Sequence, residues 1–229
     1  MEELLVSSLR VRGALVTASL ADHPRGAAVV ATLRDHDVPT QEVSEVDFAS
    51  AADTETPQGI LAVAEIPTRT FATLTTPPTH RLLVLDAIQD PGNVGTMLRT
   101  AAALGAAATI ALPGTVDLWN AKVVRSAMGA HFHHPALSST WPELDAFLHE
   151  REITLWGADS AGDPLEARLG DENAPVPQRL ALAFGNEGSG LSPAVRERAA
   201  RLVALPITTE VESLNVAVAA GIILYELRR

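Results

Sequence analysis

Cysteine is absent from the 229 residues of this chain. Without thiols the protein can form neither disulfide bonds nor thiolate metal sites, and a reducing compartment is its natural setting. The opening residues MEELLVSS lack the basic region and long apolar stretch of an export signal, and the longest uncharged run, Thr100 to Val116, is interrupted by glycine and proline. We therefore expect a cytoplasmic protein with no membrane segment.

Positive charge is scarce as well. Lysine occurs once, at Lys122, and the formal net charge is −11. Binding of nucleic acid over a whole protein surface requires clustered lysine and arginine, so the composition excludes that mode and leaves room only for a local basic patch. With 47% hydrophobic residues the chain can still bury a substantial core.

The order of apolar runs and turn residues predicts an α/β protein with two parts. Short strands and small helices in residues 1–67 indicate a small α/β domain, and the threonine- and proline-rich residues 68–80 indicate a linker. Strands and helices then alternate through residues 81–229, which predicts a mostly parallel sheet covered on both faces. The predicted strands are 82–85, 108–112, 153–158, 180–184 and 201–205, and the predicted helices are 93–104, 120–128, 141–150, 193–198 and 213–227.

Three polar segments follow strands in this second part: DPGNVG from Asp90, GNEGSGLS from Gly185 and LPITTEVESLN from Leu205. Because parallel strands direct the loops that follow them to one edge of the sheet, we expect the three segments to form a single pocket. The glycine-rich segment lacks the GK[ST] of a P-loop and the spacing of a dinucleotide-binding fingerprint.

Each polar residue in these segments also has a purely structural interpretation. Asn93 can be an ordinary helix cap and Arg99 an ordinary surface residue, although both could lean toward one pocket mouth if Asn93 caps the helix. Glu187 lies in what could be a tight turn. Ser213 is expected to cap the last helix, with Asn215 in its first turn.

Two other motifs do not support chemistry. The sequence HFHH contains His131, His133 and His134, which could ligate a metal, but on a strand the first two would face one side and the third the other. No carboxylate lies at a diagnostic spacing, so no metal site is predicted. Around Ser160 the order GADSAG departs from the GxSxG pattern because Asp159 intervenes, so a hydrolase is not supported.

Taken together and in order, DPGNVGTMLRT, FGNEGSGLS and LPITTEVESLNVAVA resemble the three signature segments of the SpoU, or TrmH-like, family of RNA 2′-O-ribose methyltransferases in the SPOUT superfamily. The resemblance covers roughly residues 80–229, and TPQGILAVAEI resembles the end of the L30e-like substrate-binding domain of several ribosomal-RNA members. It implies a deep C-terminal trefoil knot, a shortened L30e-like domain before it, a homodimer formed through the knotted domain, S-adenosyl-L-methionine (AdoMet) as cofactor, and ribosomal RNA rather than transfer RNA as substrate.

The resemblance also implies site residues. The catalytic polar positions are Asn93, Arg99, Glu187, Ser213 and Asn215, and the cofactor-binding positions are Gly185, Asn186, Leu205, Ile207 and Leu214. The family assigns deprotonation of the ribose 2′-hydroxyl to the arginine, although a guanidinium is a poor base and could instead bind phosphate and polarise the hydroxyl. Thr209 stands where many members have glycine, Glu212 has a claim to chemistry by its position beside Ser213, and local positive charge could come from Arg125, Arg196, Arg198 and Arg201.

Two alternatives remain open at this point. One is a non-catalytic RNA-binding or ribosome-assembly factor that keeps the fold. The other is a doubly wound enzyme that binds a different nucleotide at the edge of its sheet.

Overall fold

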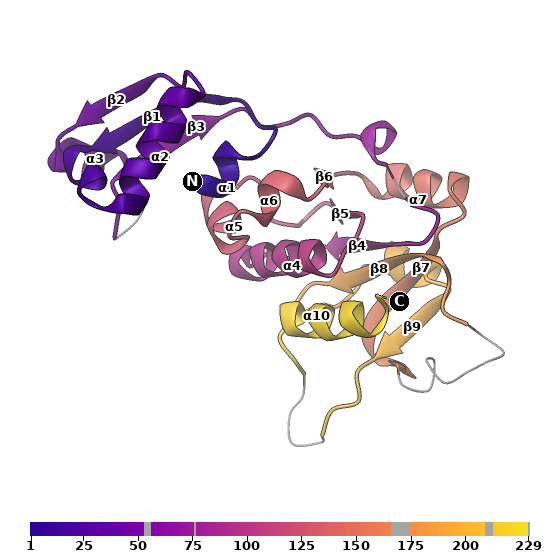
Figure 1. The fold of residues 1–229 in the computed structure, drawn as a ribbon. Helices are drawn as coiled ribbons and strands as arrows, with labels where there is room; N and C mark the ends of the chain where they lie inside the picture. Colours follow the sequence, from indigo (N-terminus) through magenta and orange to yellow (C-terminus); the bar gives the residue numbers. More distant parts are fainter. Residues whose placement is uncertain (53–55, 76, 166–174, 209–212, 229) are drawn as a thin grey trace. The chain divides into compact units, whose positions relative to one another are not determined.

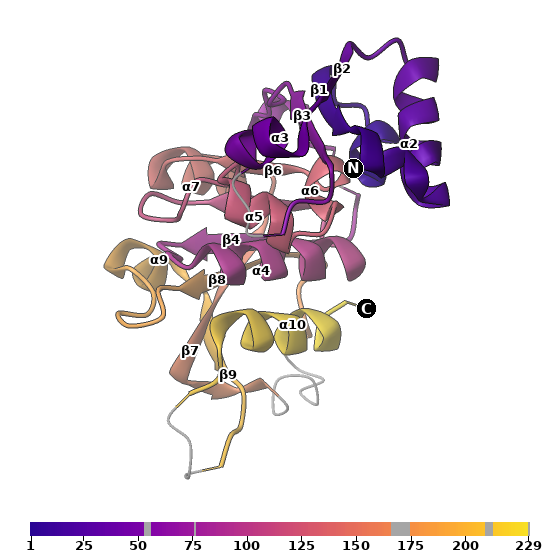
Figure 2. The same cartoon turned by 90° about the vertical axis from the view of Figure 1, so that its left-hand side faces the viewer.

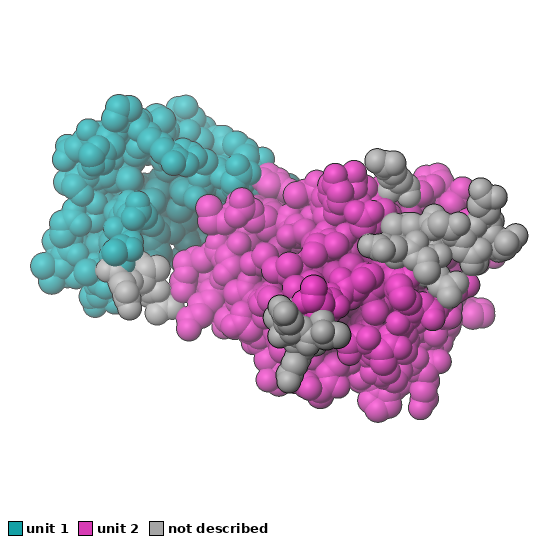
Figure 3. Space-filling model, turned by 90° about the horizontal axis from the view of Figure 1, so that it is seen from below, with its two compact units in different colours: residues 1–68 teal, residues 69–229 magenta. Residues whose placement is uncertain are grey.

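The computed structural model describes residues 1–52, 56–75, 77–165, 175–208 and 213–228. The chain divides into two compact units, Met1–Thr68 and Arg69–Arg229, which are coloured separately in Figure 3. Every helix in the described ranges is too short or too polar to cross a lipid bilayer.

The first unit is a small mixed sheet with helices. Its central strand β1 (Val11–Thr17) pairs in parallel with β2 (Thr40–Val43) and antiparallel with β3 (Ile60–Ala64). The helical elements of this unit are α1 (Glu2–Leu5), the 3₁₀ turn η1 (Ala18–Asp22), α2 (Pro24–Asp35) and α3 (Glu45–Ala51). Alternate β1 residues pack against α1 and α2 to form its apolar core, which comprises Leu5, Ala14, Val16, Val29 and Leu33.

The second unit contains a six-stranded sheet in the order β6-β5-β4-β8-β7-β9 (Figure 1). The strands are β4 (His80–Asp86), β5 (Ala108–Ala111), β6 (Ala136–Ser138), β7 (Thr154–Pro164), β8 (Arg179–Gly185) and β9 (Arg201–Ala204). All of its strand pairs are parallel, so the prediction of an α/β fold with a mostly parallel sheet is confirmed. The direction of strand succession reverses between β4 and β8, and open α/β sheets commonly bind ligands at the carboxyl ends of the strands near such a reversal.

Helices cover both faces of this sheet. The helices that pack against one face are α4 (Pro91–Ala103), α5 (Ala121–Ser126) and α10 (Val216–Glu226), and those on the other are α7 (Trp141–Glu150) and α9 (Pro193–Arg198). Figures 1 and 2 show α4 and α10 side by side. Gly95 permits close packing of α4 on α5, because a Cβ at this position would lie 2.3 Å from the Ser126 Cβ.

The residues of the second unit that precede β4 contact its later elements. The short 3₁₀ turn η2 (Phe71–Thr73) carries a phenyl ring that stacks on Phe147 of α7, with ring centroids 4.4 Å apart. The Arg69 guanidinium donates a hydrogen bond to the His134 carbonyl oxygen. These contacts anchor part of the segment that the sequence indicates as a linker.

The histidine-rich segment forms a short helix, so the arrangement considered for a strand does not apply. After Gly129, whose φ of 90° is left-handed, residues Ala130–His133 form helix α6. The helix carries His131 into the interior, where its ring meets Trp119 edge-on and neither ring nitrogen has a hydrogen-bond partner among the described residues. Burial, reinforced by the charge of Arg69, lowers the pKa of His131 to about 4, and the same causes lower the pKa of His134 to about 4.

Candidate functional site

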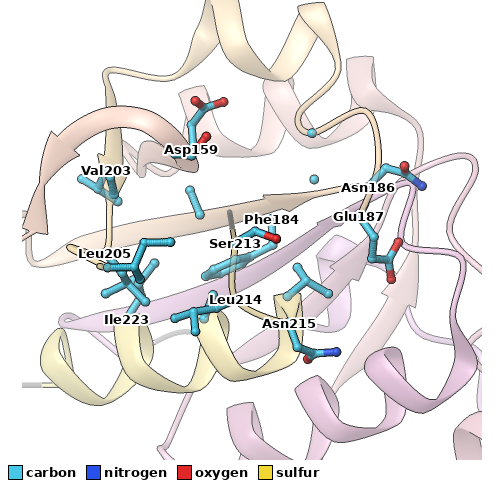
Figure 4. Close-up of a pocket in the computed structure, with 18 residues that line it drawn as sticks. Asp159, Phe184, Asn186, Glu187, Val203, Leu205, Ser213, Leu214, Asn215 and Ile223 are labelled. Atoms are coloured by element: carbon cyan, nitrogen blue, oxygen red, sulfur yellow. The ribbon is translucent and has the colours of Figure 1, made fainter. Parts of the chain in front are cut away.

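A cavity of about 410 Å³ lies where β7, β8 and β9 give way to the segments that follow them (Figure 4). This volume falls within the roughly 300–1,000 Å³ typical of small-molecule sites. Its apolar lining includes Phe184, Val203, Leu205, Leu214 and Ile223. Phe184 and Val203 are part of the main core, so this side of the cavity is rigidly supported.

All five residues that the resemblance assigns to the cofactor line this cavity. They are Gly185, Asn186, Leu205, Ile207 and Leu214. Three of the five assigned catalytic residues, Glu187, Ser213 and Asn215, line it too. Thr209 and Glu212 lie outside the described residues.

Asn93 connects the other two segments through its side-chain amide. Its Nδ2 donates to Glu187 Oε1 at 2.9 Å, and its Oδ1 accepts from Asn215 Nδ2 at 2.9 Å. An ionised carboxylate only accepts hydrogen bonds, so Glu187 fixes which way the Asn93 amide is turned, and Asn93 in turn fixes Asn215. We call these three side chains the amide relay. It joins one residue from each of the three polar segments.

The observed N-caps of α4 and α10 differ from the residues that the sequence suggested. Asp90, not Asn93, caps α4, since its side chain accepts the Asn93 N–H at 2.7 Å. Asn215, not Ser213, caps α10, because its Oδ1 accepts the N–H groups of Ala217 and Val218. Both caps belong to the residue types favoured at helix starts, so the sequence contained a correct candidate in each case. The amide of Asn93 is thereby left available for the relay.

The glycine-rich loop after β8 is a tight turn held by Asn186. The Asn186 Oδ1 accepts the N–H groups of Gly188 and Ser189, and its Nδ2 donates to the Ala87 carbonyl at 2.9 Å. Backbone hydrogen bonds between Asn186 and Gly190 close the turn. A Cβ at Gly185 would lie 2.2 Å from the carbonyl carbon of Gly190, so this glycine is required by the turn itself.

Sequence reasoning missed two carboxylates at this site. Asp86, at the end of β4, is 4% exposed and accepts the Ser192 N–H at 2.6 Å, which ties the loop after β8 to the neighbouring strand. Asp159 lines the cavity, and its side chain is 9% exposed and paired with Arg196. An aspartate at a strand end was a usable signal for Asp86. For Asp159 the sequence offered no such signal beyond its place in GADSAG, where it interrupts the GxSxG pattern.

Arg99 lies apart from the cavity in the single chain. The residue is exposed on α4, one turn beyond Gly95, and is not among the residues that line the cavity. It forms no ion pair with any acidic group in the described ranges. Its guanidinium is therefore free to bind an anion from solution.

Most of the other arginines considered for a basic patch are neutralised locally. Arg196 pairs with Asp159, Arg198 with Asp145 at 2.7 Å, and Arg201 with Asp163 at 4.0 Å. Arg125 is exposed on α5 without an acidic partner within the described part of the chain. Unpaired positive charge is therefore found at Arg99 and Arg125, on two helices that pack against each other.

The charge of the cavity itself is negative. Among the described residues that line it, Asp159 and Glu187 carry carboxylates and none carries a cationic side chain. Figure 4 shows the two acidic side chains at opposite ends of the apolar floor. Because Asp159 is paired with Arg196, the uncompensated negative charge of the lining is that of Glu187, and such a lining suits a ligand with an apolar part and a positive charge.

Comparison with known proteins agrees with these features. The chain matches the model of the SpoU rRNA Methylase family over residues 80–225. It is 39% identical over 186 residues to the 23S rRNA (guanosine(2553)-2'-O)-methyltransferase RlmP of Bacillus subtilis (strain 168). The aligned region covers 81% of this chain and 71% of that protein. It is 40% identical over 151 residues to the 23S rRNA (guanosine-2'-O-)-methyltransferase RlmB of Neisseria meningitidis serogroup B (strain ATCC BAA-335 / MC58). The aligned region covers 65% of this chain and 58% of that protein.

A solved structure extends the similarity to nearly the whole chain. The SpoU methyltransferase AviRb from Streptomyces viridochromogenes, crystallised in complex with the cofactor AdoMet, superposes with a TM-score of 0.87 at 27% sequence identity. The superposition covers 99% of this chain and 85% of the AviRb chain. The signature segments, the parallel sheet and these matches together show that this chain belongs to the SpoU rRNA methylase family.

Proposed function

We propose that the protein is an AdoMet-dependent RNA 2′-O-ribose methyltransferase that acts on ribosomal RNA. Membership of the SpoU family and the activities named for the Bacillus and Neisseria relatives support the reaction and the substrate. The proposal rests chiefly on one observation: the second and third signature segments line one cavity, and Asn93 of the first segment is hydrogen-bonded to a lining residue of each. With ribosomal RNA as substrate, the protein would act in the cytoplasm.

The cavity fits AdoMet in both shape and charge. AdoMet supplies an electrophilic methyl group on a positively charged sulfonium sulfur. The apolar side chains of Leu205, Ile207 and Leu214 offer a surface for its flat adenine, and Gly185 and Asn186 line the cavity as well. The unpaired carboxylate of Glu187 and the lack of a cation among the described lining residues suit the sulfonium charge.

The polar residues then have distinct tasks. The relay of Asn93, Glu187 and Asn215 holds the three loops in register around the cavity, and Ser213 provides a hydroxyl at its wall. Arg99 binds the phosphate of the target nucleotide or polarises its 2′-hydroxyl, which its freedom from ion pairs with the described residues permits. Positioning of the ribose oxygen against the methyl group contributes much of the rate in such transfers.

Arg99 is not among the residues that line the cavity of its own chain, which is compatible with a site completed by a second copy. We propose a homodimer in which Arg99 of one copy faces the cavity of the other. The outward face of α10 supports this arrangement, since Val218, Ile222 and Tyr225 recur at helical spacing and are 51%, 40% and 51% exposed. An apolar stripe of this kind on a helix is typical of an interface.

Two further features of the family are proposed for this chain. We infer that the segments around β8, β9 and α10 form the deep trefoil knot of SPOUT methyltransferases. We also infer that residues 1–67 form an L30e-like domain that binds RNA, joined through residues 68–80 to the methyltransferase domain. The parallel sheet and the small mixed sheet of the first unit are compatible with these assignments.

The direct test is methylation of ribosomal RNA with radiolabelled AdoMet, followed by mapping of 2′-O-methyl positions. We expect labelling at a defined ribose with the natural protein and a loss of roughly 100-fold or more with Arg99→Ala. AdoMet binding without labelling of any RNA would favour a non-catalytic assembly factor. Calorimetric binding of NAD in place of AdoMet would favour a different nucleotide enzyme.

A further inference from the structure

Most cations of the second unit are already engaged within the described part of the chain. Those within 4.0 Å of a carboxylate are Arg151, Arg179, Arg196, Arg198 and Arg201. Arg69 and Arg81 donate hydrogen bonds to backbone carbonyl oxygens, and the guanidinium of Arg228 lies 3.4 Å from the centroid of the neighbouring tyrosine ring. These side chains are therefore committed to contacts within the chain.

Three cations of this unit differ from these. Arg99 on α4 and Lys122 and Arg125 on α5 are exposed, and their side chains form no ion pair or hydrogen bond with the residues that the structure describes. Neither helix contains an acidic residue. The acids that precede the helices are engaged locally, because Asp90 caps α4 and Asp117 accepts a backbone N–H at 2.9 Å. In a chain with a net charge of −11, these two helices thus concentrate positive charge.

The helices that carry these three side chains pack together (Figures 1 and 2). They meet where a Cβ on Gly95 would lie 2.3 Å from the Cβ of Ser126. Arg99 follows Gly95 by one helical turn, and Arg125 immediately precedes Ser126. Lys122 lies three positions before Arg125, which places the two Cβ atoms about 5–6 Å apart on one side of α5. We call Arg99, Lys122 and Arg125 the basic strip.

We propose that the basic strip binds the sugar–phosphate backbone of the RNA, with Lys122 and Arg125 on phosphates next to the nucleotide that Arg99 contacts. The inference rests on the proposed function. Guanidinium and ammonium groups bind phosphate oxygens through charge-assisted hydrogen bonds. Because phosphate contacts carry no sequence information, the strip supplies affinity and orientation and leaves the choice of nucleotide to other parts of the protein. The net negative charge of the chain as a whole opposes binding of RNA elsewhere and so favours this face.

The first test is the salt dependence of RNA binding by Lys122→Gln/Arg125→Gln, measured by fluorescence anisotropy with a labelled single-stranded RNA of mixed sequence. Each phosphate contact on a single strand contributes about 0.7 to the slope of log affinity against log salt, so the double variant should lower the slope by about 1.4. The difference in affinity from the natural protein should therefore shrink roughly sevenfold between about 50 and 200 mM salt. Arg151→Gln/Arg198→Gln is the matched control; it removes the same charge at α7 and α9, on the other face of the sheet, and should leave the slope unchanged.

Steady-state methylation of ribosomal RNA separates a role in RNA binding from a role in the cofactor site. The double variant should raise the KM for RNA by roughly tenfold or more at about 0.1 M salt. Its kcat should stay within about threefold of the natural value, because Arg99 and the cavity lining are unchanged. AdoMet affinity in calorimetry should also stay within about threefold, and the methylated position should be the same. Arg99→Ala should instead lower kcat.

Three results would overturn the assignment. A salt slope and a KM for RNA equal to those of the control pair would remove the basic strip alone and leave the proposed function intact. In analytical ultracentrifugation, a smaller species for the double variant but not for the control would show that the strip joins two copies of the chain, and the RNA assignment would be wrong. If the natural protein binds AdoMet but neither binds nor methylates RNA, the proposed function itself fails and the assignment fails with it.

Discussion

Replacing Asn93 with aspartate turns the hydrogen-bond donor that faces Glu187 in the amide relay into an acceptor. In Asn93→Asp an oxygen takes the place of Nδ2, which lies 2.9 Å from Glu187 Oε1, so a donor–acceptor contact becomes a contact between two carboxylates. The other half of the relay is kept, since the remaining oxygen can still accept from Asn215. The variant therefore isolates one link between the first and second polar segments.

The size of the effect can be worked out from this geometry. Two unit charges about 4 Å apart repel by about 1 kcal/mol in water and about 4 kcal/mol at an effective dielectric constant near 20. Glu187 is exposed, so we take a value near the lower limit, between about 1 and 2 kcal/mol. The lost hydrogen bond adds about 1 kcal/mol. The free energy of unfolding at pH 7 should therefore fall by about 2–3 kcal/mol.

Urea unfolding of both proteins at pH 7 and pH 5 measures this change. Acidification allows the two carboxyl groups of the variant to share a proton, so the difference between the proteins should shrink at the lower pH. Asn120→Asp is the control; Asn120 caps α5 by accepting the Lys122 N–H at 2.9 Å, and an aspartate there keeps the cap. Equal stability of Asn93→Asp and the natural protein at pH 7, or a difference that does not depend on pH, would refute the reasoning.

Three further predictions concern other parts of the second unit. His131 and His134 each have a pKa lowered to about 4 in the folded state, against about 6.5 in the unfolded state. Between these pH values the unfolded state binds more protons, so the free energy of unfolding should fall as the pH drops from about 6.5 to 4. Unfolding experiments should show a loss of about 3 kcal/mol per histidine. Gly95→Ala should lower the free energy of unfolding by about 2 kcal/mol, because its Cβ would lie 2.3 Å from the Ser126 Cβ. Ile222→Glu should convert a dimer to a monomer in analytical ultracentrifugation, since it places a charge in the apolar stripe of α10.

Matched variants test these three predictions. His131→Phe should retain only about half of the acid sensitivity, and an unchanged pH profile would contradict the role of burial. Gly188→Ala, where the nearest atom to a new Cβ is 3.6 Å away, should be far milder than Gly95→Ala. Val46→Glu alters a 79% exposed residue of the first unit and should not affect association; equal behaviour of Val46→Glu and Ile222→Glu would remove α10 from the proposed interface.

The sequence was most informative where local signals were complete. Helix α7 begins and ends where predicted, because Thr140 and Glu143 form a capping box ahead of an apolar helical repeat. Helix α9 was equally predictable from the proline at its first position. The central strands could be predicted because both faces are buried, which gives continuous apolar runs such as LLVL in β4.

The remaining features depend on contacts between distant residues. The partners in the amide relay are 94 and 122 positions apart, and no local pattern specifies that Asn93 turns toward Glu187 instead of capping its own helix. The same holds for His131, whose position in the interior is set by Trp119 and not by its neighbours in the sequence. The resemblance to a family supplied the site residues as a prediction, and the geometry adds which of them line one cavity and which are hydrogen-bonded to one another.

The central claim is that the second and third signature segments enclose a single AdoMet site in each chain, and that Asn93 of the first segment holds them in place. Isothermal titration of the natural protein and of Leu205→Arg with AdoMet tests it most directly, because an arginine on the cavity wall would oppose both the shape and the charge of the ligand. The account predicts one AdoMet per chain for the natural protein and at least roughly tenfold weaker binding for a folded Leu205→Arg variant. Unchanged affinity in that variant would contradict it.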